Sequence, residues 1–186
     1  FTVCAYMPLF YWLESGLIRA GFPAAVAGRC ISFAALCGLI FLCGRIALLY
    51  TGNRNAAWVA SLAAASSSLL GSWGTTGQVD IPAAFFALMA FYQYSRYQVR
   101  GDSSLWIAGL FAALALFTKQ TMLAAPAAIF LLLLIRDRKK ALWFGVIFGA
   151  SVGAAVLAIN TALQGRFLAN TLFANINPFS AAQFFT

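Results

Sequence analysis

The sequence lacks histidine altogether and is poor in charge. Charged residues make up 9% of its 186 residues, while hydrophobic residues reach 63%. Soluble globular domains carry about 25% charged residues. The absence of histidine excludes imidazole acid–base catalysis and histidine-ligated metal in this part of the chain. So little charge on so apolar a chain excludes a soluble domain and indicates an integral membrane protein.

Paired cysteine motifs are absent as well. The cysteines are Cys4, Cys30, Cys37 and Cys43, and no two of them form a CxxC pair. They lie mostly within one apolar run, where a small buried thiol packs well. This spacing favours a packing role over a redox or metal-binding role.

Six apolar runs are present, each bounded by turn or charge signals. They cover residues 24–50, 56–75, 81–97, 104–119, 121–135 and 141–163. These runs approach the ~20 residues that an α-helix needs to cross a bilayer. The sequence therefore predicts one all-α domain, a polytopic transmembrane bundle of about six spans. Residues 1–23 are predicted as an extracytoplasmic segment with one interfacial helix, and residues 164–186 as an extracytoplasmic loop.

The net charge of +8 is shared unequally between the two ends of these runs. One end carries Arg45, Arg54, Arg96, Arg100, Arg136, Arg138, Lys139 and Lys140, and the other carries Arg19, Arg29, Lys119 and Arg166. Since cytoplasmic loops hold the excess of lysine and arginine, the second end is predicted to lie outside the cytoplasm. The basic residues are dispersed and form no aromatic–basic surface, so no nucleic-acid partner is expected.

Two charged residues stand at the mouths of predicted spans on this second end. Asp80 begins the third run, where helix capping alone would explain an aspartate. Lys119 ends the fourth run, at the tip of a predicted tight hairpin, where snorkelling to the interface would explain a lysine. A cation on this side also suits a lipid phosphate, as do Arg29 and Arg19. Charged residues that gather at span mouths on one side of a membrane suggest an active site there.

Several short motifs follow one another in an order known from a membrane enzyme superfamily. They are YMPLFYWL, GRCISFAA, VD, FTKQT, RDRKK, GRF and NINPF. This series resembles the GT-C glycosyltransferases, and among them the bacterial family 39 proteins, relatives of protein O-mannosyltransferases and aminoarabinose transferases. The resemblance implies an enzyme of the bacterial inner membrane with its active site facing the periplasm or exterior. It would move a sugar from a polyprenyl-phosphate donor to a lipid, glycan or protein acceptor.

The resemblance also assigns a donor-phosphate pocket. Tyr6 and Pro8 belong to the segment that lines this pocket in the family. Many relatives carry Lys-Pro-Pro there, whereas this chain has Met7 before the proline. The expected cationic role therefore shifts to Lys119, Arg29 or Arg19.

Further positions take roles by the same resemblance. Asp80 matches an acidic position that orients the acceptor or a metal, and Lys119 and Gln120 match a TK turn on the same face. Asn175 lies in a tail whose amides and aromatics suit sugar binding, but these residues describe an interfacial loop equally well. The family's catalytic Asp, or Asp-Glu pair, would precede Phe1, so we expect a fragment without the main base. A divalent metal stays an open alternative.

Two other functions compete with this interpretation. A transporter or flippase for polyprenyl-linked sugars would also place charges within a membrane. It predicts inverted repeats, and none is recognisable between residues 24–97 and 104–163. The other alternative is a catalytically inactive relative that keeps the fold.

Overall fold

Helices account for nearly all of the chain that the computed structural model describes, which is residues 7–101 and 104–171. They are α1 (Leu9–Arg19), α2 (Ala24–Thr51), α3 (Arg54–Ala65), α4 (Ser68–Gly74), α5 (Asp80–Arg100), α6 (Ser104–Thr118), the 3-10 helix η1 (Gln120–Leu123), α7 (Ala124–Arg136), α8 (Arg138–Ala162) and α9 (Arg166–Thr171). No strand occurs within these two ranges. The predicted all-α class is confirmed.

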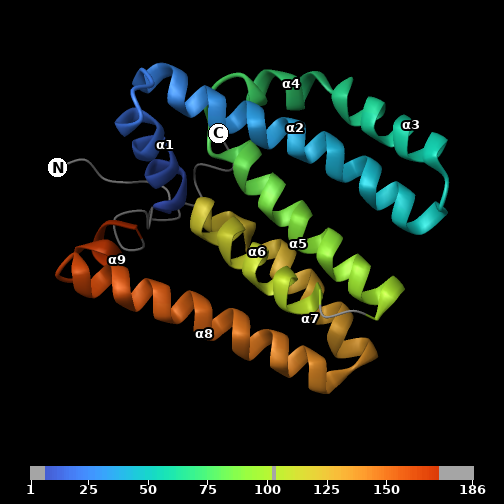
Figure 1. The fold of residues 1–186 in the computed structure, drawn as a ribbon. Coiled ribbons are helices and arrows are strands. Elements are labelled where there is room, and N and C mark those ends of the chain that lie inside the picture. Colours follow the sequence, from blue (N-terminus) through green and yellow to red (C-terminus); the bar gives the residue numbers. More distant parts are fainter. Residues whose placement is uncertain (1–6, 102–103, 172–186) are drawn as a thin grey trace, which may run out of the picture.

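The long helices lie side by side with α5 at the centre (Figure 1). On one side α5 packs against α2, which α3 and α4 cover from outside, and on the other side it packs against α6, with α8 beyond. α2 and α5 begin at the same end of the bundle. Ser32, early in α2, bonds to the loop before α5, whereas Arg45, late in α2, reaches Tyr92. The loops between helices therefore gather at two opposite ends.

The main core lies between α5, α6, α7 and α8 and is built largely from alanine. Ala90, Ala108, Ala112 and Ala141 are fully buried and make up half of its buried cluster, to which Phe144, 3% exposed, also belongs. Such small residues let helix backbones approach closely, which is the usual packing mode inside a membrane. Many large apolar side chains instead point outwards from the bundle. This inside-out distribution is typical of helices that face lipid or further helices.

The number of membrane spans differs from the sequence prediction. Among the described helices, α2 and α8 are long and apolar enough to cross a membrane by length and composition, and α6 and the η1–α7 segment are apolar but shorter. The prediction of six spans is therefore not confirmed.

The predicted run 56–75 does not form one helix, because it is interrupted by a series of serines. The Ser66 hydroxyl donates to the Ala63 carbonyl at 2.9 Å. The Ser67 hydroxyl caps α4 by accepting from the Leu70 N–H at 3.5 Å. Serine side chains compete in this way for backbone groups that a continuous helix would use. The result is two short helices, α3 and α4.

The structure describes residues 7–23 and 164–171 of the two predicted terminal segments. α1 lies within the predicted segment 1–23 and starts directly after Pro8, and its position at a membrane interface stays a prediction. The predicted loop 164–186 contains the short helix α9, whose Leu168 N–H donates to Asn160 Oδ1 at 3.1 Å. Residues 172–186 lie outside the described residues.

Candidate active site

The structure brings together Asp80 and Lys119, which are 39 positions apart in the sequence. Asp80 is the first residue of α5, and Lys119 follows the last residue of α6, the neighbour of α5. Lys119 Nζ donates to Asp80 Oδ1 and forms an ion pair with it. Each of these side chains is 20% exposed. The pair is thus largely shielded from water. In such surroundings the attraction between opposite charges is stronger than at an open surface.

Helix capping does not account for Asp80. Val79 occupies the cap position of α5, without a capping hydrogen bond from its side chain, and Asp80 lies one position inside the helix. The carboxylate remains favourably placed in the first turn, near the positive end of the helix dipole. Its recorded side-chain partner is Lys119.

Lys119 reaches α5 because the chain reverses there within a single extended residue. Its backbone has φ −147° and ψ 123°, between the end of α6 and the start of η1. The Lys119 N–H closes α6 on the Ala115 carbonyl at 2.9 Å, and its own carbonyl accepts from the Met122 N–H at 3.0 Å. The tight hairpin predicted around Lys119 is therefore confirmed, while its depth in a membrane stays a prediction.

The loop before Asp80 is pressed onto the first turns of α2. Gly77 has φ +68°, and a Cβ added to it would lie 3.2 Å from the Arg29 nitrogen. The Ser32 hydroxyl, fully buried, donates to the Gln78 carbonyl at 2.9 Å. Position 77 favours glycine for two reasons: glycine tolerates a positive φ, and its missing side chain leaves room for α2. The loop thereby sets the position at which α5, and with it Asp80, begins.

A cavity of about 400 Å³ opens beside this loop. Its lining comes from α1, the loop and the start of α5, and consists of Phe10, Tyr11, Glu14, Gly77, Gln78, Val79 and Asp80. Two carboxylates therefore face one cavity. Gly28 on α2 permits the approach of α1, since a Cβ at that position would lie 3.0 Å from Glu14 Oε1.

Glu14 is the residue that the sequence analysis missed. It lies in the segment 1–23, for which the sequence predicts an interfacial helix and no site residue at this position. The sequence nonetheless distinguished Glu14. The chain has four acidic residues, and only Glu14 and Asp80 fall on the predicted extracytoplasmic side. No hydrogen bond or ion pair to the Glu14 carboxylate is recorded within residues 7–101 and 104–171.

The other expected site residues lie around this cavity or away from it. Arg29 is exposed, but its backbone touches the Gly77 loop. Gln120 directly follows Lys119, and its Oε1 is buried without a hydrogen-bond partner among the described residues. Pro8 precedes the first residue of α1, and Arg19 is exposed at the far end of that helix. Neither of these two lines the cavity.

Tyr6 and Asn175 lie outside the described residues, so their assignments stay predictions. Within the described part of the chain, no group of three or more acidic, cysteine or histidine side chains is placed to hold a metal ion. We therefore derive no step through a metal.

These features define an apolar helical protein that gathers charged side chains in one cavity at one end of its bundle. Residues 6–163 match the family model described as dolichyl-phosphate-mannose-protein mannosyltransferase, and the chain belongs to this family. Comparison with curated proteins and with solved structures gave no match. The family, together with the two long apolar helices, indicates a membrane glycosyltransferase. The resemblance drawn from the sequence motifs is confirmed at this level.

Proposed function

We propose that the protein transfers a sugar from a polyprenyl-phosphate donor to an acceptor hydroxyl on the extracytoplasmic face of a bacterial inner membrane. The acceptor is a lipid, a glycan or a protein. The observation that carries the proposal is the Asp80–Lys119 ion pair, which borders a cavity with a second carboxylate from Glu14. The proposal places both substrates' reacting groups in this cavity.

The two carboxylates differ in their surroundings, which gives them different roles. Asp80 is neutralised by Lys119 and is suited to hold and orient the acceptor through hydrogen bonds. Glu14 has no recorded cation beside it within the described residues. Because the Glu14 carboxylate lines the cavity, a hydroxyl of an acceptor bound there can donate to it directly. We therefore assign Glu14 the role of proton acceptor.

The proposed step is an inverting displacement. The acceptor hydroxyl gives its proton to Glu14, and its oxygen forms a bond to the anomeric carbon of the sugar. The bond between that carbon and the phosphate oxygen breaks, and the polyprenyl phosphate leaves with the electron pair. Lys119 and Arg29 supply positive charge near the departing phosphate, and such charge stabilises a transition state most in a site poor in water.

Neutral variants of the two carboxylates test this function in the full-length protein. Glu14→Gln and Asp80→Asn should each lower kcat for sugar transfer from a polyprenyl-phosphate donor by about 100-fold or more. Asp137→Asn, at the other end of the bundle, is the matched control and should retain activity. Membrane abundance of each variant serves as the check on folding.

The outcomes separate the competing ideas. If Glu14→Gln keeps the kcat of the unmodified protein while Asp80→Asn loses it, the base lies elsewhere, which agrees with the expectation of a base before Phe1. Undiminished transfer in both variants would remove the cavity from the reaction. Movement of the lipid-linked sugar across vesicles without transfer would instead establish the transporter alternative.

A further inference from the structure

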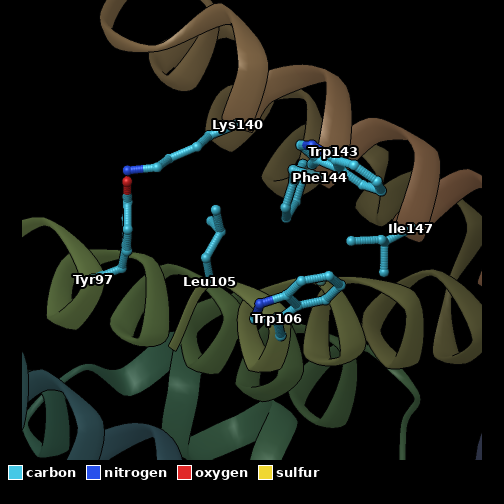
Figure 2. A pocket seen from close by; sticks show the side chains of 8 residues that line it. Tyr97, Leu105, Trp106, Lys140, Trp143, Phe144 and Ile147 are labelled. Atoms are coloured by element: carbon cyan, nitrogen blue, oxygen red, sulfur yellow. The ribbon is translucent and has the colours of Figure 1, made fainter. Parts of the chain in front are cut away.

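A second hollow lies between α6 and α8 (Figure 2). It is near the end of the bundle opposite to Asp80. It has a volume of about 320 Å³ and is lined by Tyr97, Leu105, Trp106, Gly109, Lys140, Trp143, Phe144 and Ile147. We call it the α6–α8 groove. α5 has 21 residues, and Asp80 and Tyr97 lie in its first and last turns. At 1.5 Å per residue, the two sites are separated by about 25 Å along the bundle.

The walls of this groove are apolar and aromatic. Trp106 from α6 and Trp143 from α8 face each other across it, with Phe144 and Ile147 beside Trp143 (Figure 2). The two tryptophans are 59% and 63% exposed, so the groove is open to its surroundings. Gly109 has no side chain to occupy the groove, and a Cβ at that position would be in ordinary contact with the Phe144 ring at 3.7 Å. A hydrocarbon chain suits such a slot.

A cation stands at one end of the groove. Lys140 and Tyr97 point toward one another there (Figure 2), with Lys140 Nζ 5.0 Å from the centre of the Tyr97 ring. Lys140 Nζ also lies 3.5 Å from Asp137 Oδ2. The adjoining turn, RDRKK, carries four basic residues against one acidic residue. Its Arg138 and Lys139 are exposed and have no recorded ion pair within the described residues.

Three tryptophans at this end of the bundle lie at similar positions along its axis. Trp58, Trp106 and Trp143 each lie in the first two turns of a helix that starts here, namely α3, α6 and α8. All three are more than half exposed. Tryptophan gathers where lipid headgroups meet acyl chains. The α6–α8 groove therefore spans the boundary between the headgroups and the hydrocarbon of one leaflet.

We propose that the α6–α8 groove binds one anionic phospholipid of that leaflet. One acyl chain lies between Trp106 and Trp143, and the phosphate is held by Lys140, with Arg138 nearby. Charge complementarity selects this occupant, because a neutral lipid or an apolar helix of another protein would leave the excess positive charge of the RDRKK turn uncompensated. Basic pockets between membrane helices are known to recognise such headgroups. This site is distinct from the catalytic cavity and does not rest on the proposed function.

The experiment measures quenching of tryptophan fluorescence in vesicles of phosphatidylglycerol or phosphatidylcholine with brominated acyl chains. We expect the full-length protein to prefer brominated phosphatidylglycerol several-fold over brominated phosphatidylcholine. Lys140→Gln should remove most of this preference. Lys139→Gln makes the same change of charge one position away, outside the groove, and should leave most of it.

A second pair of variants tests the apolar part. Trp143→Ala should remove the tryptophan that phosphatidylglycerol quenches preferentially, whereas Trp58→Ala, in the same belt but outside the groove, should keep that component. Equal effects of Lys140→Gln and Lys139→Gln would overturn the proposal, since general charge attraction would then suffice. Equal quenching by both lipids would also overturn it. A Trp143 that no lipid quenches would show that another protein segment fills the groove.

Discussion

Replacing Gly77 with alanine should be more damaging than replacing Gly101 with alanine, although both glycines have φ +68°. A Cβ at Gly101, just after α5, would meet nothing within 4 Å. A Cβ at Gly77 would lie 3.2 Å from both the Arg29 nitrogen and the Gly28 carbonyl carbon. Both substitutions therefore introduce the same backbone strain, but only the one at Gly77 also brings a side chain against α2.

The size of the difference follows from these contacts. A residue other than glycine in the left-handed region costs about 1–2 kcal/mol, which is the whole effect expected at Gly101. At Gly77 the obstructing atoms are backbone and cannot rotate away, so the loop must shift by a few tenths of an ångström. That shift stretches the 2.9 Å hydrogen bond from Ser32 to Gln78. Losing it would add about 1 kcal/mol, for a total of about 2–3 kcal/mol at Gly77.

Thermal unfolding in detergent and sugar transfer provide the two readouts. Gly77→Ala should lower the midpoint of unfolding more than Gly101→Ala and should also lower kcat, because Asp80 starts directly beyond the loop. Gly101→Ala should lower stability alone. If the two variants lose equal stability and equal activity, the packing of the loop on α2 does not position Asp80, and the structural argument fails.

Two further predictions concern charged pairs. In a double-mutant cycle, Asp80→Asn and Lys119→Gln should show a coupling of about 0.5–3 kcal/mol in stability, because the two side chains are in direct contact; additive losses would contradict an ion pair in the folded protein. Asp137 accepts from the Lys140 N–H, and this hydrogen bond holds the pKa of its carboxyl below the ordinary 3.8. The resulting stability is present above the unfolded pKa and is lost as the pH falls through the folded pKa. The stability advantage over Asp137→Asn, which keeps a capping side chain, should therefore shrink on acidification below about pH 4; a constant difference would exclude this linkage.

Much of the fold was predictable because helices are specified by local features of the sequence, namely runs of apolar residues and the turn residues that bound them. The predicted runs 24–50 and 141–163 correspond to α2 and α8 within three residues at each end. The run 56–75 was wrong as a single helix, because Ser66 and Ser67 are individually compatible with a helix and their hydrogen bonds decide the break only in three dimensions. The number of helices that cross the membrane depends on how the helices pack and lie in the bilayer, which local sequence patterns do not specify.

The site was predictable where a residue stood out against its background. Asp80 and Lys119 are charges in apolar contexts, and alternating helix directions already placed them at one end. Their direct contact depends on the short reversal after α6, which composition alone does not specify. Glu14 was missed because α1 resembled a surface helix, and its approach to the cavity depends on the absence of a side chain at Gly28.

The distribution of charge gives the two ends of the bundle different chemistry. The Asp80 end holds four basic residues against two acidic ones, a net +2, while the opposite end holds eight against two, a net +6. At the first end Lys119 is already paired with Asp80, so an arriving phosphate gains only the difference between two partners. In the reaction that we propose, this balance allows the site to bind an anionic donor and still release an anionic product. At the second end the same number of carboxylates faces twice as many basic residues, which suits lasting attachment to anionic lipid.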